Sequence, residues 1–239
     1  MICDNRIMIF GDSILKGVVL DQEQKYRVGS GLELEQLGAE HGLRIENHSR
    51  FGCTCGKGMA MLERLLARGD RPEAVVLGYG GNDADFDWAE VAAAPEAEHL
   101  PHTPLAQFTA LYQQAIARLR ALDIRPVLIT LPPVCAGRYF RWITRNGLNA
   151  GAILRWLGDV EAIYRYQERY SRALETLARD SGCLCVDLRG ALLQNRRLEP
   201  YYCDDGIHPN EAGQQVLHRA VESMLDSLPA RPAVGQAAG

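Results

Sequence analysis

The stretch Arg6-Ile7-Met8-Ile9-Phe10-Gly11-Asp12-Ser13, close to the start of the chain, decides the fold class. Its apolar residues predict a strand that is buried on both faces. Gly11 ends the apolar run, and Ser13 follows almost at once. In open parallel sheets, ligands bind at the carboxyl ends of the strands. The Ser13 hydroxyl is therefore expected at the edge of a sheet where a ligand would lie.

Four further strand-like segments follow, separated by stretches with apolar residues at helical spacing. The strands are expected at residues 43–47, 74–78, 126–131 and 183–187. The helices are expected at residues 31–42, 58–68, 103–122 and 160–181, with a last helix that begins at Pro209. This alternation predicts an α/β fold with a five-stranded parallel sheet that helices cover on both faces.

The composition is that of an ordinary globular protein. The chain has 239 residues, of which 47% are apolar and 23% charged, and its net charge is −4. Scattered Lys and Arg residues argue against a nucleic-acid partner. No apolar stretch reaches the roughly 18 residues of a membrane span. The first residues lack the apolar core of a secretory signal, so a cytoplasmic location is expected.

Two connections are unusually long for such a fold. Residues 86–102 follow the third strand and residues 135–159 follow the fourth, and both leave the edge where a ligand would bind. The second is too apolar and aromatic to be disordered. We interpret it as a lid over the ligand or as the interface of a homo-oligomer. The chain is thus predicted as a single domain over residues 1–228, followed by a flexible tail at 229–239.

Seven cysteines include two pairs with a single residue between them, Cys53/Cys55 and Cys183/Cys185. A zinc site is one interpretation, although zinc ligands more often follow C-x2-4-C spacing. Reduced, buried or half-buried thiols are the simpler interpretation.

A carboxylate and an imidazole stand three residues apart in Asp205-Gly206-Ile207-His208. Nucleophilic serine catalysis needs a hydroxyl, a base that takes its proton and an acid that orients the base. Ser13, His208 and Asp205 are the candidates for these roles. Each also fits a structural role, as a helix N-cap, a helix start and a turn residue respectively. No G-x-S-x-G motif is present, which argues against an α/β-hydrolase architecture.

Two further positions are candidates for stabilising negative charge. Asn82 follows the third strand in a glycine-rich turn, where its carboxamide N–H can be offered to an oxyanion, although Asn is also common in such turns for conformational reasons. Gly52 follows the second strand and offers a backbone N–H. His48 in the same loop is more typical of a structural histidine than of a second base. Phe86, Trp88 and the His99/His102 pair are expected near the mouth of the pocket.

In this order and setting, these pieces resemble the SGNH hydrolase superfamily, also called the GDSL esterases and lipases, over most of the chain. The resemblance rests on Gly11-Asp12-Ser13, Gly52, Gly80-Gly81-Asn82-Asp83 and Asp205-Gly206-Ile207-His208-Pro209. Ile14 replaces the leucine of the first family motif, and the side chains around Gly52 are less typical. The resemblance implies a flavodoxin-like three-layer α/β/α sandwich.

The resemblance also implies the roles of the site residues. Ser13 would be the nucleophile, His208 the general base and Asp205 its orienting acid. The oxyanion hole would consist of the Ser13 N–H, the Gly52 N–H and the Asn82 side chain. No metal or organic cofactor is expected.

The expected function is that of a serine esterase that hydrolyses short-chain acyl or acetyl esters through an acyl-enzyme intermediate. A thioesterase, a lysophospholipase or a carbohydrate O-deacetylase of the same superfamily is the alternative. Outside that class, a non-catalytic flavodoxin-like binding protein is conceivable, but Ile14-Leu15-Lys16-Gly17 is a poor cradle for phosphate. A small-molecule ester is the expected partner.

Overall fold

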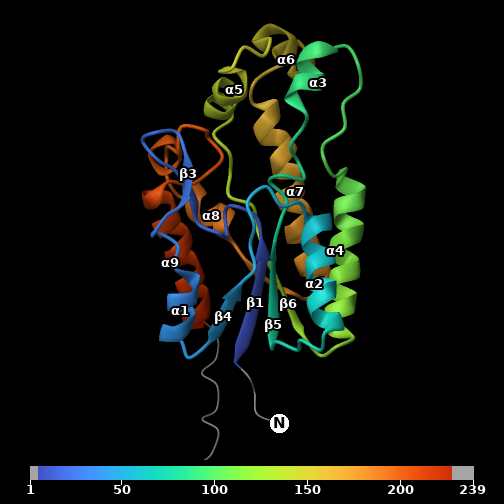
Figure 1. Cartoon of the computed structure of the whole chain (residues 1–239), viewed down its shortest axis with the longest axis vertical. Helices are drawn as coiled ribbons and strands as arrows, with labels where there is room; N and C mark the ends of the chain where they lie inside the picture. Colours follow the sequence, from blue (N-terminus) through green and yellow to red (C-terminus); the bar gives the residue numbers. More distant parts are fainter. Residues whose placement is uncertain (1–4, 228–239) are drawn as a thin grey trace, which may run out of the picture.

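The computed structural model describes residues 5–227 of the chain. Five parallel strands form a sheet in the order β4-β1-β5-β6-β7 (Figure 1). These strands are β1 (Arg6–Gly11), β4 (Arg44–Asn47), β5 (Ala74–Gly78), β6 (Arg125–Ile129) and β7 (Leu184–Val186). The predicted α/β fold with a five-stranded parallel sheet is confirmed.

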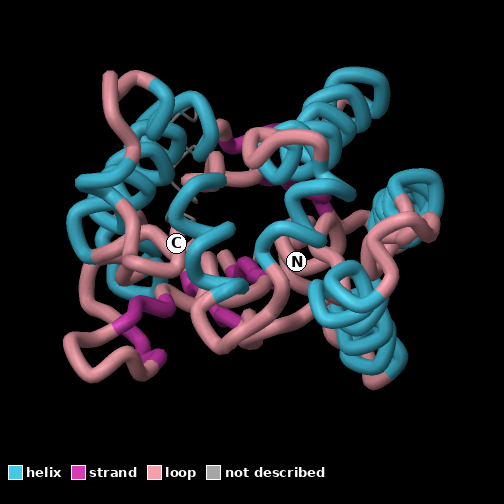
Figure 2. Tube along the Cα trace, turned by 90° about the horizontal axis from the view of Figure 1, so that it is seen from above, coloured by secondary structure: helices cyan, strands magenta, loops and turns pink. Residues whose placement is uncertain are grey.

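Helices cover both faces of the sheet (Figures 1 and 2). One face packs against α2 (Cys55–Ala67), α4 (Leu105–Arg120) and α7 (Ala162–Ser181). The other packs against α1 (Leu34–Glu40), α8 (Leu188–Leu193) and α9 (Glu211–Ser227). Side chains along β1 point alternately to the two faces of the sheet. Met8 and Phe10 therefore lie in the core on the α2, α4 and α7 side, and Ile9 lies in the core on the α1, α8 and α9 side.

Three short helices and a hairpin lie beyond the carboxyl ends of the strands (Figure 1). The helices are α3 (Trp88–Ala93), α5 (Ala136–Thr144) and α6 (Ala150–Leu157), and the hairpin pairs β2 (Val18–Leu20) with β3 (Tyr26–Val28). The helices share a third apolar cluster that includes Phe86, Trp88, Val91 and Ile153. Both long connections of the sequence are therefore folded, and they pack against each other within one chain.

The six cysteines within the described residues are free thiols that are buried or half-buried. This agrees with the interpretation that they are reduced thiols. Cys53 lies in a turn and Cys55 opens α2, so this pair does not share the face of a strand. Among residues 5–227, no three His, Cys, Asp or Glu side chains are grouped to hold a metal ion.

The same residues contain no helix with the length and apolar character needed to cross a bilayer. The predicted tail at 229–239 and the domain boundary at 228 lie outside the described residues.

Candidate active site

The site lies where the strand order reverses. β1 lies between β4 and β5, and Gly11 at its end is in register with Gly78 at the end of β5. A reversal of this kind leaves a crevice at the carboxyl ends of the strands. Ser13 leaves β1 there and Asn82 leaves β5, so the topology itself brings the two side chains to the same crevice.

The loop before α9 brings the predicted base to Ser13. His208 Nε2 lies 2.8 Å from Ser13 Oγ, although the two residues are 195 positions apart in the chain. Ser13 and His208 are 7% and 3% exposed, so little water competes for this hydrogen bond. The proton of the Ser13 hydroxyl is thus within direct transfer distance of the imidazole.

Asp205 fixes the orientation of this imidazole. Its Oδ2 lies 2.7 Å from His208 Nδ1, and its Oδ1 accepts the backbone N–H groups of Ile207 and His208 at 3.1 Å each. Burial by itself would raise the pKa of Asp205, but hydrogen bonds and the charge of His208 hold it below its usual range. Asp205 is therefore ionised and accepts the Nδ1 proton, which leaves Nε2 free to accept from Ser13.

Asp12 and Asn82 form a second polar pair beside Ser13. Asp12 Oδ1 accepts the Ile14 N–H at 2.9 Å, and Asp12 Oδ2 lies 3.4 Å from Asn82 Nδ2. Burial raises the pKa of Asp12 to about 6. The same amide nitrogen of Asn82 lies 3.3 Å from the Cys53 carbonyl oxygen. Both contacts are long, so they position the carboxamide while leaving it able to turn toward an oxyanion.

The turn that carries Gly52 is bonded to the same loop. Asp83, which follows Asn82, accepts the Cys55 N–H at the start of α2 at 3.0 and 3.1 Å. Gly52 has φ +65°, in the left-handed region that favours glycine. The N–H groups of Gly52 and Ser13 donate to no acceptor among the described residues. Both groups are therefore free to bind a ligand.

Aromatic rings border the imidazole. The Phe51 ring stacks on His208 with centroids 5.9 Å apart and planes at 10°, and the Tyr26 ring lies 5.1 Å from the imidazole. These rings remain 53% and 39% exposed. Trp142 on α5 lies 6.4 Å from Tyr26. Tyr26 could not be identified from the sequence, because no local pattern shows that the β2–β3 hairpin folds back over the loop that carries His208.

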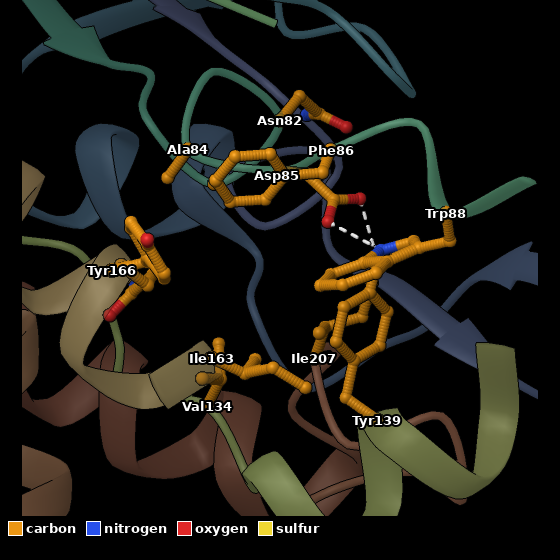
Figure 3. A pocket seen from close by; sticks show the side chains of 12 residues that line it. Asn82, Ala84, Asp85, Phe86, Trp88, Val134, Tyr139, Ile163, Tyr166 and Ile207 are labelled. Carbon is orange, nitrogen blue, oxygen red and sulfur yellow. Dashed lines mark hydrogen bonds between the residues drawn. The ribbon is translucent and has the colours of Figure 1, made fainter. Parts of the chain in front are cut away.

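A pocket with a cavity volume of about 60 Å³ opens beside these groups. Asn82 and Ile207, the neighbour of His208, line it together with Phe86 and Trp88 (Figure 3). Phe86 and Trp88 were expected at the pocket mouth, whereas they are largely buried in its wall. The pocket also contains Asp85, which the sequence analysis did not single out.

Three further histidines that the sequence pointed to make no contact with Ser13, Asp205 or His208. His48 stacks on Phe10 at 5.1 Å, in keeping with a structural role. His102 Nδ1 donates to the Asn82 carbonyl oxygen at 2.9 Å and so supports the loop of Asn82. His99 packs against Trp156 on α6.

Comparison with known proteins identifies the family of the chain. Residues 9–216 match the profile of the GDSL-like Lipase/Acylhydrolase family. The chain belongs to this family. The resemblance seen in the sequence is thus confirmed. A search of curated proteins finds no significant match.

Solved structures share the fold of this GDSL-like protein across almost all of its length. A lipase/acylhydrolase from Enterococcus faecalis is 18% identical, with a TM-score of 0.64, and the match covers 95% of this chain and 99% of that one. A mutant of Axe2, an acetylxylan esterase from Geobacillus stearothermophilus, is 19% identical, with a TM-score of 0.61 and coverage of 92% and 93%. The psychrotrophic esterase EstA from Pseudoalteromonas sp. is 16% identical, with a TM-score of 0.58 and coverage of 93% and 97%. At these identities the likeness shows the fold.

Proposed function

We propose that the protein is a serine esterase that hydrolyses short-chain acyl or acetyl esters through an acyl-enzyme intermediate. The observation that carries this proposal is the chain of two hydrogen bonds from Ser13 Oγ through His208 to Asp205, at 2.8 and 2.7 Å. Such a chain lets the imidazole take the hydroxyl proton while the carboxylate stabilises the imidazolium. Membership of the GDSL-like Lipase/Acylhydrolase family supports the same reaction class.

The reaction proceeds in two balanced halves. Ser13 Oγ attacks the carbonyl carbon while its proton moves to His208 Nε2. The bond to the alcohol oxygen then breaks, and His208 returns the proton to the leaving alcohol. A water molecule loses a proton to His208 and attacks the acyl-enzyme, which releases the acid and restores the Ser13 hydroxyl. Asp205 keeps its charge throughout and orients the ring.

Negative charge develops on the carbonyl oxygen in both halves. Three donors are available to it: the free N–H groups of Ser13 and Gly52, and the Asn82 carboxamide. Donors held in place before the reaction stabilise a transition state without reorganising, which applies to the two backbone N–H groups. The Asn82 carboxamide has only to turn from its two long contacts. The Asn82–Cys53 and Asp83–Cys55 contacts hold the Asn82 loop and the Gly52 turn together, which supports this assignment.

The size of the pocket favours a short acyl group. A cavity of about 60 Å³ holds only a few water-sized groups. A long fatty acyl chain would have to leave this pocket and cross the surface. The thioesterase and lysophospholipase alternatives, which would use such chains, are less favoured for this reason.

A carbohydrate O-deacetylase is the second candidate. The observation that favours it is the pair of exposed rings, Tyr26 and Phe51, against His208, where a leaving alcohol is protonated. Exposed aromatic faces suit the apolar face of a sugar. A series of p-nitrophenyl esters of increasing chain length, measured beside acetylated sugars, separates the two candidates. A steep preference for acetylated sugars would favour the deacetylase.

The assignment of Ser13 has a direct test. We expect a fluorophosphonate to label the wild-type protein at Ser13 and to leave Ser13→Ala unlabelled, with loss of p-nitrophenyl acetate hydrolysis in that variant. Ser30→Ala, which changes an exposed serine that belongs to neither the predicted triad nor the predicted oxyanion hole, serves as the control and should be labelled normally. Near-normal hydrolysis by Ser13→Ala would refute the proposal.

A further inference from the structure

The pocket beside Asn82 contains a carboxylate that the proposed reaction does not use. Asp85 lines a wall that is otherwise mostly apolar and aromatic (Figure 3). Among the described residues that line this pocket, none is Lys, Arg or His. His102 lies close enough to act electrostatically on Asp85, but its Nδ1 donates to the Asn82 carbonyl oxygen and it does not line the pocket. An acidic group placed in such a wall is costly in free energy unless something offsets its charge.

Two neutral donors hold this carboxylate in place. Trp88 Nε1 donates to Asp85 Oδ1 at 2.9 Å, and the Tyr139 hydroxyl donates to Asp85 Oδ2 at 2.5 Å. Burial raises the pKa of Asp85, although these hydrogen bonds oppose the shift. Trp88 and Tyr139 therefore fix the orientation of the carboxylate, but they bring no formal positive charge to it. Each carboxylate oxygen also has further lone-pair directions for a ligand.

The aromatic rings around Asp85 would attract a cation as well. Phe86, Trp88, Tyr139 and Tyr166 all line the pocket (Figure 3). The centroid of the Phe86 ring lies 5.7 Å from that of Trp88 and 5.1 Å from that of Tyr166, so the rings form a continuous wall. The faces of aromatic rings attract cations, and more strongly when water is excluded. A carboxylate within such a wall suits a ligand group that is small and positively charged.

We propose that this pocket binds an ammonium group of the substrate, and that Asp85 selects esters with such a group over alkyl esters of the same size. The inference rests on the proposed esterase function and names the substrate class within it. An alkyl group in the pocket would remove water from Asp85 without replacing its hydrogen bonds. An ammonium group supplies both the missing hydrogen bonds and the missing charge.

The test compares two pairs of isosteric esters at pH 7. Ethyl 3-aminopropanoate is matched with ethyl butanoate, and 2-(dimethylamino)ethyl acetate with 3-methylbutyl acetate, so both halves of the ester are covered. In at least one pair we expect kcat/KM of the wild-type protein to be roughly 10- to 100-fold higher for the ammonium ester, the range for hydrogen bonds to charged groups. Equal or better use of the alkyl ester in both pairs would overturn the proposal.

Variants assign the preference to Asp85. In the Asp85→Asn variant, kcat/KM for the ammonium ester divided by kcat/KM for the alkyl ester should fall to about one or below, because the amide carries no charge. Glu90→Gln is the matched control, since it removes an exposed negative charge from α3 without touching the pocket, and it should keep the wild-type ratio. Loss of the preference in Glu90→Gln, or its retention in Asp85→Asn, would contradict the role of Asp85.

Binding provides a readout that does not depend on hydrolysis or on the folding of a variant. Trp88 lines the pocket and contributes, together with Trp142 and Trp156, to the fluorescence of the protein. We expect saturable quenching of the wild-type protein by propylammonium but not by propan-1-ol, which has the same number of heavy atoms. Absence of any difference between the two ligands would overturn the inference. If none of the four esters is cleaved and a fluorophosphonate leaves Ser13 unlabelled, the proposed function fails, while the propylammonium titration still decides on the pocket.

Discussion

At the scale of single residues, the imidazole of His208 is held from several directions. Asp205 binds Nδ1, Ser13 binds Nε2, and the rings of Phe51 and Tyr26 lie beside it. A ring with this many contacts has little freedom to rotate. The catalytic geometry that we propose is therefore present before any substrate binds, which lowers the entropy lost on reaching the transition state.

Asn82→Ala tests the predicted oxyanion donor. Loss of one donor of this kind lowers kcat by about 10²- to 10³-fold. We expect kcat to fall by that amount for p-nitrophenyl acetate while KM changes little, because the donor acts mainly on the developing charge. Asn195→Ala, on the loop after α8, is the control and should retain its activity. An unchanged kcat in Asn82→Ala would remove Asn82 from the oxyanion hole.

Asp12 makes the stability depend on pH. Its pKa of about 6 in the folded protein lies above that of an unfolded aspartate, so the folded state binds the proton more tightly. Stability should therefore fall as the pH rises from about 4 to about 6. Asp205 acts in the opposite direction at lower pH, because its lowered pKa contributes stability that is lost as the pH falls below about 4.

Asp12→Asn should remove the first of these contributions. We expect the difference in free energy of unfolding between pH 4 and pH 7 to change by about 2 kcal/mol relative to the wild type. Urea unfolding at the two pH values measures it. Asp180→Asn, at an exposed position, is the control and should leave the difference unaltered. A wild-type pH dependence in Asp12→Asn would show that Asp12 is not the titrating group.

At the scale of elements, the loop that carries Asp205 and His208 is anchored to α5. The Cys135 N–H donates to the Gly206 carbonyl oxygen at 2.8 Å. Gly206 has φ +74°, and a Cβ there would lie 2.7 Å from Arg138 Cβ, the Cys135 oxygen and the Tyr139 nitrogen. Only glycine allows this approach, so α5 contributes to the position of the base although it carries none of the predicted triad.

Gly206→Ala tests this anchoring. The new methyl group must push the loop away from α5, so we expect kcat to fall by at least tenfold, roughly the effect of a small misplacement of reacting groups. Gly182→Ala is the matched control, because Gly182 has a similar φ of +61° with nothing within 4 Å of the added atom. It should lower stability by about 1–2 kcal/mol through backbone strain and leave kcat intact. Equal kcat values for both variants would contradict the anchoring role.

The elements differ in how well the sequence predicted them. The five strands lie within two residues of their predicted positions, because buried parallel strands are short apolar runs with clear ends. The hairpin of β2 and β3 was missed, since strands of three residues leave no periodic pattern. Helices α3, α5, α6 and α8 were missed for a similar reason, as they have only six to nine residues each.

At the scale of the whole molecule, the third apolar cluster is a separate layer above the strand ends. Ile153 on α6 is fully buried in it, beside residues of α3 and α5. The insertion at 135–159 thus buries most of its apolar side chains against its own chain. Among its described large apolar residues, Leu154 is the one with substantial exposure. A homo-oligomer formed through this insertion stays a prediction.

Ile153→Ala tests whether this layer opens independently of the sheet. Removal of buried methyl groups lowers stability by about 2–5 kcal/mol. We expect faster amide exchange in α3, α5 and α6 with unchanged protection of β1 and β5. We also expect a higher KM, because Trp88 of α3 and Tyr139 of α5 line the pocket. Leu128→Ala, buried in β6, is the comparison and should accelerate exchange throughout. Uniform acceleration in Ile153→Ala would show that layer and sheet unfold as one unit.

The sequence alone determined the five strands, five of the helices that cover them and the identity of Ser13, Asn82, Asp205 and His208 as candidates, because apolar periodicity and short motifs are local properties. The tertiary structure decided how far these side chains lie from one another, and it added Tyr26, Phe51 and Asp85 to their surroundings. Such contacts join residues from distant parts of the chain. They depend on how the hairpin and the inserted helices pack over the strand ends, and no local pattern records that packing.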